Sequence, residues 1–216
     1  DWLGVDSLIE GIRLREAGIT APILVLGYTL PSMFGRAARH GISVTISTFE
    51  NIAAIKSLTI RKKLRIHLKI DTGMRRQGFF PSQVDEAIEM IRTTSAIELE
   101  GIYTHFADAK NPAFPKQTRE QMKRFDEVVD RVRAAGFDPL VHAAATSTTI
   151  LFPEMHYDMV RCGIGLYGLW PSPETRSYAA DFLSLMPALT WKSVISEVKV
   201  LSKGDAVGYG FTERIG

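Results

Sequence analysis

Residues 66–78 (IHLKIDTGMRRQG) place charged side chains directly after a segment of alternating apolar residues. The alternation predicts a strand that ends near Lys69, and Asp71, Arg75 and Arg76 follow it. Buried charges are costly unless they are paired, whereas barrel enzymes carry their catalytic groups at the carboxyl ends of strands. Lys69 is therefore a site candidate. The alternative is an exposed Lys69–Asp71 pair beside two solvated arginines.

His105 occupies the same kind of position, in the segment GIYTHFA at the end of another expected strand. A lone histidine beside apolar residues is more often a satisfied core residue than a functional one. Polar residues at the ends of several different strands are, however, what a barrel active site requires. His105 therefore joins the catalytic candidates.

Arg161 lies in an otherwise apolar segment, between YDMV and CGIGLYG. Its guanidinium stays charged and needs an acceptor. Two kinds of acceptor are open: Asp158 or another carboxylate, in a structural pair, or a bound ligand.

Hydroxyl side chains gather in residues 145–149 (ATSTT), where a short helix is expected to begin. They can serve simply as caps, but free backbone N–H groups at such a point also bind phosphate. Barrels often bind phosphate near their last two strands, and Gly163 would let the next loop approach closely. Thr146 and Gly163 together favour a phosphate site.

The other histidines and the single cysteine suggest no further chemistry. His40, His67 and His156 lack the spacing of metal ligands, so we expect no metal site. His142 could be buried structure or a hydrogen-bond donor behind the site. Cys162 has no catalytic partner and no second cysteine for a disulfide, which agrees with a cytoplasmic protein.

The composition is that of an ordinary globular protein, with 45% hydrophobic and 23% charged residues. A net charge of +2 is too small to indicate nucleic acid or an acidic membrane as a partner. No apolar run reaches the ~20 residues that cross a bilayer. We therefore expect a small-molecule partner, and neither nucleic acid nor a membrane.

Strands and helices are expected to alternate along the chain. Helices are predicted over 8–17, 30–40, 48–60, 81–92 and 117–135, with a short one from about 147. Strands are predicted over 21–28, 42–47, 64–70, 97–106, 139–144 and 158–166. This order predicts parallel βαβ units in a closed barrel or an open doubly wound sheet. One GxGxxG match occurs, at residues 163–168 (GIGLYG), but it overlaps the strand expected over 158–166 and no expected helix follows it, so the usual support for a dinucleotide-binding sheet is missing.

The pattern changes after Gly168, where residues 169–175 are rich in proline and serine. Residues 188–201 (ALTWKSVISEVKVL) alternate like an antiparallel strand, and 206–211 would begin another after a turn. We therefore expect one domain over 1–184 and the start of an all-β domain over 185–216.

These segments resemble the alanine racemases, which use pyridoxal 5'-phosphate (PLP), including the serine/alanine racemases of glycopeptide-resistant bacteria. Residues 66–78 match the family segment K-[IVM]-D-T-G-M-x-R-x-G. Residues 5–28 (VDSLIEGIRLREAGITAPILVLGY) match E-A-x-x-L-R-x-x-G-I-x-x-P-I-L-V-L-G, and blocks at 101–109, 142–153, 158–168 and 204–210 follow in the family's order. The resemblance implies an α/β fold, a PLP-binding (β/α)8 TIM-type barrel that lacks its first strand here. It also implies a C-terminal β-domain and a head-to-tail homodimer.

The resemblance implies roles for the catalytic candidates. Arg161 would hydrogen-bond the pyridine nitrogen of PLP and keep it unprotonated, and His105 would contact Arg161 and orient a tyrosine base. Arg76 would bond the phenolic oxygen of PLP near the substrate carboxylate. Lys69 matches a lysine that is often carbamylated in the family.

It implies a phosphate site as well. Thr146 would meet the phosphate through its hydroxyl, with the backbone of Gly163 and Ile164 assisting. The family often has Asn-Ser where this chain has Ala145-Thr146, so the hydroxyl is kept and a side-chain amide is lost.

The implied activity is interconversion of L-alanine and D-alanine by two bases, for peptidoglycan. The family's Schiff-base lysine, in a VKANAYGHG-like segment, and its tyrosine base, in an IGYADG-like segment, have no counterpart in these 216 residues. We therefore expect an internal fragment that is inactive alone. The alternatives are a serine racemase, a PLP-binding regulatory barrel, which the β-pattern after Pro187 argues against, and a decarboxylase of similar architecture.

Overall fold

The computed structural model describes residues 1–113 and 115–216 and divides the chain into two compact units, Asp1–Met186 and Pro187–Gly216. The first unit holds one sheet of seven parallel strands, which lie in the order of the sequence. They are β1 (Leu3–Val5), β2 (Ile23–Val25), β3 (Ser43–Ile46), β4 (Leu64–Lys69), β5 (Ile97–Tyr103), β6 (Leu140–Ala145) and β7 (Met159–Arg161). The predicted TIM-type barrel without its first strand is confirmed.

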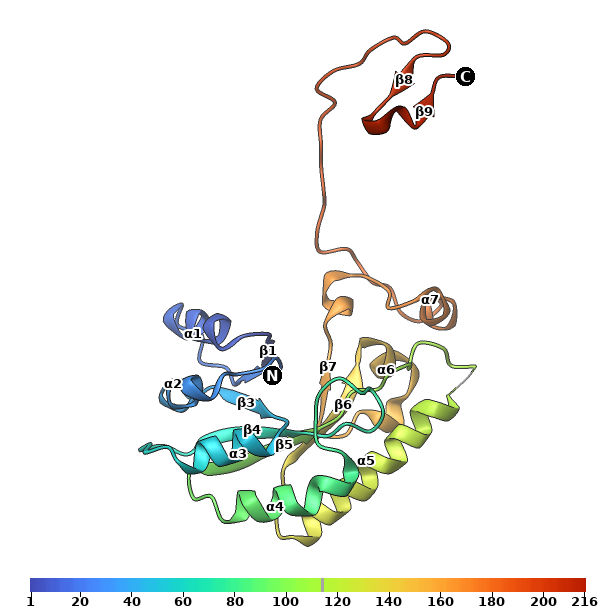
Figure 1. Ribbon diagram of the computed structural model, residues 1–216. Coiled ribbons are helices and arrows are strands. Elements are labelled where there is room, and N and C mark those ends of the chain that lie inside the picture. Colours follow the sequence, from blue (N-terminus) through green and yellow to red (C-terminus); the bar gives the residue numbers. More distant parts are fainter. Residues whose placement is uncertain (114) are drawn as a thin grey trace. The chain divides into compact units, whose positions relative to one another are not determined.

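Helices connect successive strands, as parallel pairing requires. They are α1 (Leu8–Glu16), α2 (Phe34–His40), α3 (Phe49–Lys56), α4 (Val84–Arg92), α5 (Lys116–Ala134) and α6 (Thr146–Leu151), and one more helix, α7 (Pro173–Ala179), follows β7. Local sequence sets their ends: the Ser7 and Thr48 hydroxyls accept from the backbone N–H groups of Glu10 and Asn51. Gly41 ends α2 with a φ of 58°, a left-handed conformation that favours glycine. In Figure 1, α4 and α5 lie side by side on one face of the sheet.

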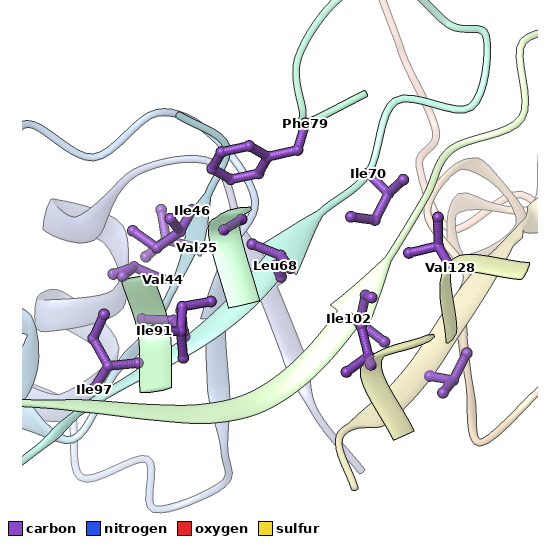
Figure 2. Close-up of a cluster of buried hydrophobic side chains, with 14 of the residues drawn as sticks. Val25, Val44, Ile46, Leu68, Ile70, Phe79, Ile91, Ile97, Ile102 and Val128 are labelled. Atoms are coloured by element: carbon purple, nitrogen blue, oxygen red, sulfur yellow. The ribbon is translucent and has the colours of Figure 1, made fainter. Parts of the chain in front are cut away.

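The alternation of β4 separates the hydrophobic core from the barrel interior. Leu64, Ile66 and Leu68 belong to the core between the sheet and the helices. Figure 2 shows Leu68 among side chains from other strands and from α4, including Ile91. Because side chains alternate along a strand, Arg65, His67 and Lys69 lie on the opposite face of β4, and His67 and Lys69 are buried there.

Three sequence predictions for the first unit need correction. β1 was not expected: three residues are too few to show a periodicity, yet Leu3–Val5 pairs in register with Ile23–Val25. The last strand ends at Arg161 and not at residue 166, because the chain turns at Gly163 into a 3-10 turn at Ile164–Tyr167. α7 was also not expected; Ser172 caps it and Pro173 begins it.

The second unit holds a two-stranded antiparallel sheet of β8 (Ala206–Val207) and β9 (Glu213–Arg214). The prediction of a strand over 188–201 is wrong, since these residues have neither strand nor helix. Their apolar side chains, including Trp191 and Val198, are exposed. A strand needs a neighbour to satisfy its backbone groups, and the described chain supplies none here. The strand expected over 206–211 is limited to β8, because a 3-10 turn follows at Tyr209–Phe211.

Among the helices of the described residues, none combines the length and the apolar character needed to cross a membrane.

Candidate active site

A cavity of about 520 Å³ opens at the carboxyl ends of the central and last strands of the first unit. All seven residues that the sequence singled out for the site line it, although they come from four different strand ends. They are Lys69, Arg76, His105, Thr146, Arg161, Gly163 and Ile164. The structure therefore brings the candidates together in one hollow.

The charge of the cavity lining is one-sided. Lys69, Arg76, Lys110 and Arg161 line it, and no aspartate or glutamate of the described residues does. The hydroxyls of residues 146–148 line the same cavity. Several cations and hydroxyl donors without a competing carboxylate suit an anionic ligand.

Arg161 is held by four acceptors, and none is a carboxylate. Its Nη1 lies 2.8 Å from His142 Nδ1, and its Nη2 donates to the carbonyls of Thr104 (2.8 Å) and Ala143 (2.9 Å). Nη2 also lies 3.3 Å from His105 Nδ1. The pairing with Asp158 that the sequence left open is not present; Asp158 accepts from the backbone N–H of Val141 instead.

The contacts and burial of these two side chains determine the charge of Arg161 and the charge and tautomer of His105. Burial lowers the pKa of Arg161 to about 10, so that it stays charged at neutral pH. A guanidinium only donates, so His105 Nδ1 accepts and its proton sits on Nε2. Burial, followed by the charge of Arg161, lowers the pKa of His105 to about 4, which keeps the imidazole neutral.

Lys69 is buried, with 4% of its surface exposed, so the exposed pair with Asp71 is corrected. Asp71 instead accepts from the backbone N–H groups of Gly73 (2.9 Å) and Arg75 (3.0 Å). Burial, and then the charges of neighbouring arginines, lower the pKa of Lys69 to about 6. Much of the Lys69 amine is therefore neutral and nucleophilic near pH 7.

Arg75 and Arg76 are both exposed, but they are not a matched pair. Arg75 has a φ of 57° and lies 5.0 Å from the ring centroid of Phe80, while Arg76 lines the cavity. Only Arg76 is therefore placed to meet a ligand.

Thr146 is tied to the loop after β7. Its Oγ1 accepts from the backbone N–H groups of Gly163 (3.2 Å) and Gly165 (3.3 Å). A Cβ at Gly165 would come within 2.7 Å of Thr146 Cγ2, so the close approach requires glycine. The Thr146 hydroxyl keeps its own proton for a further acceptor.

Sequence reasoning missed two lining residues and left a third residue open. Tyr103 pairs in register with Lys69 and lies two residues before His105, on the same side of an extended chain, which was the available signal. Lys110 was not singled out from the sequence, but it lines the cavity. His142, left open between structure and support, is fully buried and contacts Arg161. In the part of the chain that the structure describes, no three His, Cys, Asp or Glu side chains gather as metal ligands.

Comparison with known proteins places this chain in a family. The family model of the alanine racemase N-terminal domain matches residues 1–171. Alanine racemase 2 of Oceanobacillus iheyensis is 39% identical over an alignment of 216 positions that covers 98% of this chain and 53% of that protein. The chain therefore belongs to the alanine racemase family, and it spans about half the length of the curated relatives it matches.

Solved structures agree in fold. The alanine racemase of Bacillus anthracis with bound L-Ala-P is 34% identical with a TM-score of 0.89, over 99% of this chain and 55% of that one. The histidine racemase of Leuconostoc mesenteroides is 32% identical with a TM-score of 0.79, over 98% of this chain and 56% of that one. The barrel is thus shared by racemases named for different amino acids.

Proposed function

We propose that the full-length protein containing this chain is a PLP-dependent alanine racemase, which interconverts L-alanine and D-alanine. The observation that carries the proposal is the meeting of seven candidate residues in one cationic cavity. Membership of the family supports the same activity. We further propose that the protein acts in the cytoplasm, supplies D-alanine for peptidoglycan and forms a head-to-tail homodimer.

The side chains of the cavity fit PLP, an anionic, phosphorylated pyridine. The Thr146 hydroxyl would bind the phosphate, with the backbone of Gly163 and Ile164 beside it. Arg161 would donate to the pyridine nitrogen, and Arg76 would meet the phenolic oxygen. When bound, PLP supplies an electron sink for charge at the substrate's α-carbon.

Arg161 would determine the strength of that sink. Its pKa of about 10 keeps it protonated at neutral pH, so it donates a hydrogen bond without giving up the proton. By keeping its proton, Arg161 would leave the acceptor nitrogen of bound PLP unprotonated, which would restrain charge transfer into the ring and limit side reactions. His105, whose neutral Nε2–H faces away from Arg161, would orient the tyrosine base.

Racemisation needs a proton donor on one face of the α-carbon and an acceptor on the other. The family's Schiff-base lysine and tyrosine base match no segment of these 216 residues. We therefore propose that residues 1–216 alone do not turn over. Turnover by the purified 216-residue chain would contradict this.

A racemase for another amino acid is the second candidate. The similarity to a histidine racemase favours it, and serine is a further substrate to test. The test is to express the full-length protein, load it with PLP and supply L-alanine, L-serine and L-histidine separately. We expect D-alanine to form fastest. PLP binding without racemisation of any of the three would overturn the proposal.

A further inference from the structure

The barrel interior holds a second set of polar side chains behind the cavity. His67 and His142 have no exposed surface, and the Glu100 side chain beside them is only 15% exposed. None of the three lines the cavity. Burying a carboxylate and two imidazoles is costly unless each finds a partner, so their contacts indicate their role.

A series of contacts joins these side chains to Arg161. Arg161 Nη1 lies 2.8 Å from His142 Nδ1, and His142 Nε2 lies 2.8 Å from His67 Nδ1. His67 Nε2 then lies 3.4 Å from Glu100 Oε2, a polar contact that is too poorly aligned for a hydrogen bond. The series therefore ends at the Glu100 carboxylate, and its longest contact is the one between His67 and Glu100.

The chemistry of its two ends sets the direction of the series. Arg161 can only donate, so His142 Nδ1 accepts and the proton of neutral His142 sits on Nε2. That proton is donated to His67 Nδ1, so neutral His67 carries its own proton on Nε2, facing Glu100. Burial lowers the pKa of both histidines, which favours these neutral forms. The Glu100 carboxylate can only accept a hydrogen bond. The two ends of the series, Arg161 and Glu100, therefore require the same direction of donation, from Arg161 towards Glu100.

The backbone is shaped around the series. The register of β4 with β5 shifts at His67, which leaves Glu100 as the extra residue of a β-bulge. The next residue, Gly101, pairs with His67, and a Cβ there would overlap the imidazole ring. Arg65 Nη1 lies 3.1 Å from Glu100 Oε1, and the Ser43 hydroxyl donates to Oε2. Arg65 and Ser43 therefore hold the Glu100 carboxylate in place independently of its contact with His67.

We propose that Glu100, His67 and His142 are positioning residues for Arg161. They hold its guanidinium in the orientation in which Nη2 reaches His105 Nδ1, at 3.3 Å, and so set the tautomer of His105. The proposal deepens the proposed function and rests on it for its consequence, the contact between Arg161 and PLP. The series itself lies within this chain and can be tested without PLP.

His105 reports the position of Arg161. The charged groups that act on it are Arg161, Lys69 and Arg76, in that order after burial. If Arg161 moves away, repulsion of a second positive charge weakens and the pKa of His105 rises from about 4. Simple loss of the Glu100 charge has the opposite sign, because removing a negative charge lowers the pKa. The two effects can therefore be told apart.

The experiment is histidine side-chain ¹⁵N NMR of the full-length protein without PLP, recorded as a pH titration. Glu100→Leu removes the acceptor for His67, and Glu100→Gln keeps an acceptor while removing the charge. We expect the titration midpoint of His105 to rise by roughly one pH unit in E100L and to stay or fall in E100Q. Glu98→Leu, at an exposed position of β5, is the matched control and should change nothing.

His142→Leu keeps Glu100 intact and removes the acceptor for Arg161, so it tests the series even if E100L does not fold. We expect a rise of the His105 midpoint at least as large as in E100L, with loss of the pure Nε2–H tautomer. An unchanged or lower midpoint in a folded H142L or E100L protein overturns the proposal. If the full-length protein racemises alanine but the His105 midpoint does not shift in the variants, only the positioning role of the series is overturned. If the His105 midpoint shifts as predicted but the full-length protein does not racemise alanine, only the proposed function is overturned.

Discussion

Lys69 Nζ lies 4.2 Å from the ring centroid of Tyr103, and Arg161 lies 5.0 Å from the same centroid. The phenol is fixed in turn: its hydroxyl lies 2.8 Å from Thr45 Oγ1, which donates to the carbonyl of Val25. Because the single Thr45 hydroxyl proton is used there, Tyr103 is the donor. Burial raises the pKa of Tyr103, so its neutral ring contacts the Lys69 amine and the Arg161 guanidinium in the cavity.

Replacing Lys69 by methionine should stabilise the protein at neutral pH. The pKa of Lys69 is about 6 in the folded chain and about 10.4 when unfolded. Between these values the unfolded chain binds the extra proton, so the free energy of unfolding rises with pH. K69M should remove this rise and gain on the order of a few kcal/mol at pH 7.

Urea unfolding of the PLP-free protein between pH 6 and about 9.5 measures this effect. Lys123→Met on the exposed face of α5 is the control and should follow the wild type. A K69M protein with the same pH slope as wild type would show that Lys69 keeps an ordinary pKa.

The same neutral amine should react with carbon dioxide. The amine lone pair of Lys69 attacks the carbon and loses a proton, which leaves a carbamate anion near Arg76 and Arg161, two groups whose charges act on Lys69. We expect a carbamate resonance in ¹³C NMR after addition of ¹³C-bicarbonate, and none in K69M. Identical spectra for the two proteins would exclude the modification.

Thr146→Val should weaken PLP binding. It removes a hydroxyl from the cavity and leaves the N–H groups of Gly163 and Gly165 without their acceptor. Loss of such a hydrogen bond costs about 1–2 kcal/mol, or roughly a 5- to 30-fold weaker Kd. Equilibrium titration with PLP measures this Kd, with Thr93→Val at an exposed position of the protein as control. An unchanged Kd in T146V would remove Thr146 from the phosphate site.

Local pattern predicted most of the barrel. The alternation of Leu64, Ile66 and Leu68 identified β4, and hydroxyl caps and Gly41 marked helix ends. Pattern failed where structure depends on distant partners: β1 exists because Ile23–Val25 pairs with it. Residues 188–201 lack a strand in the described chain because nothing pairs with them.

The site was predictable in its membership and not in its electrostatics. Strand-end position and family resemblance named Lys69, His105 and Arg161, which line one cavity. Sequence could not show that Lys69 is buried, since burial depends on how seven strands curve together. Nor could it show that a β-bulge makes Glu100 the extra residue facing His67.

Gly101→Ala should destabilise the protein, because the added Cβ would overlap the His67 ring. Overpacking of this kind costs about 1–3 kcal/mol. Gly35→Ala is a matched control in α2, where a Cβ meets nothing within 4 Å, and it should be neutral or stabilise by up to about 1 kcal/mol. Urea unfolding compares the two. Equal stability of G101A and G35A would contradict the packing described for His67.

The central claim, that this cavity holds PLP, is tested most directly by a crystal structure of the full-length protein with PLP bound. We predict the phosphate on the Thr146 hydroxyl and the backbone of Gly163 and Ile164, with the pyridine nitrogen accepting from Arg161. PLP bound elsewhere, or bound with its ring nitrogen away from Arg161, would contradict the account.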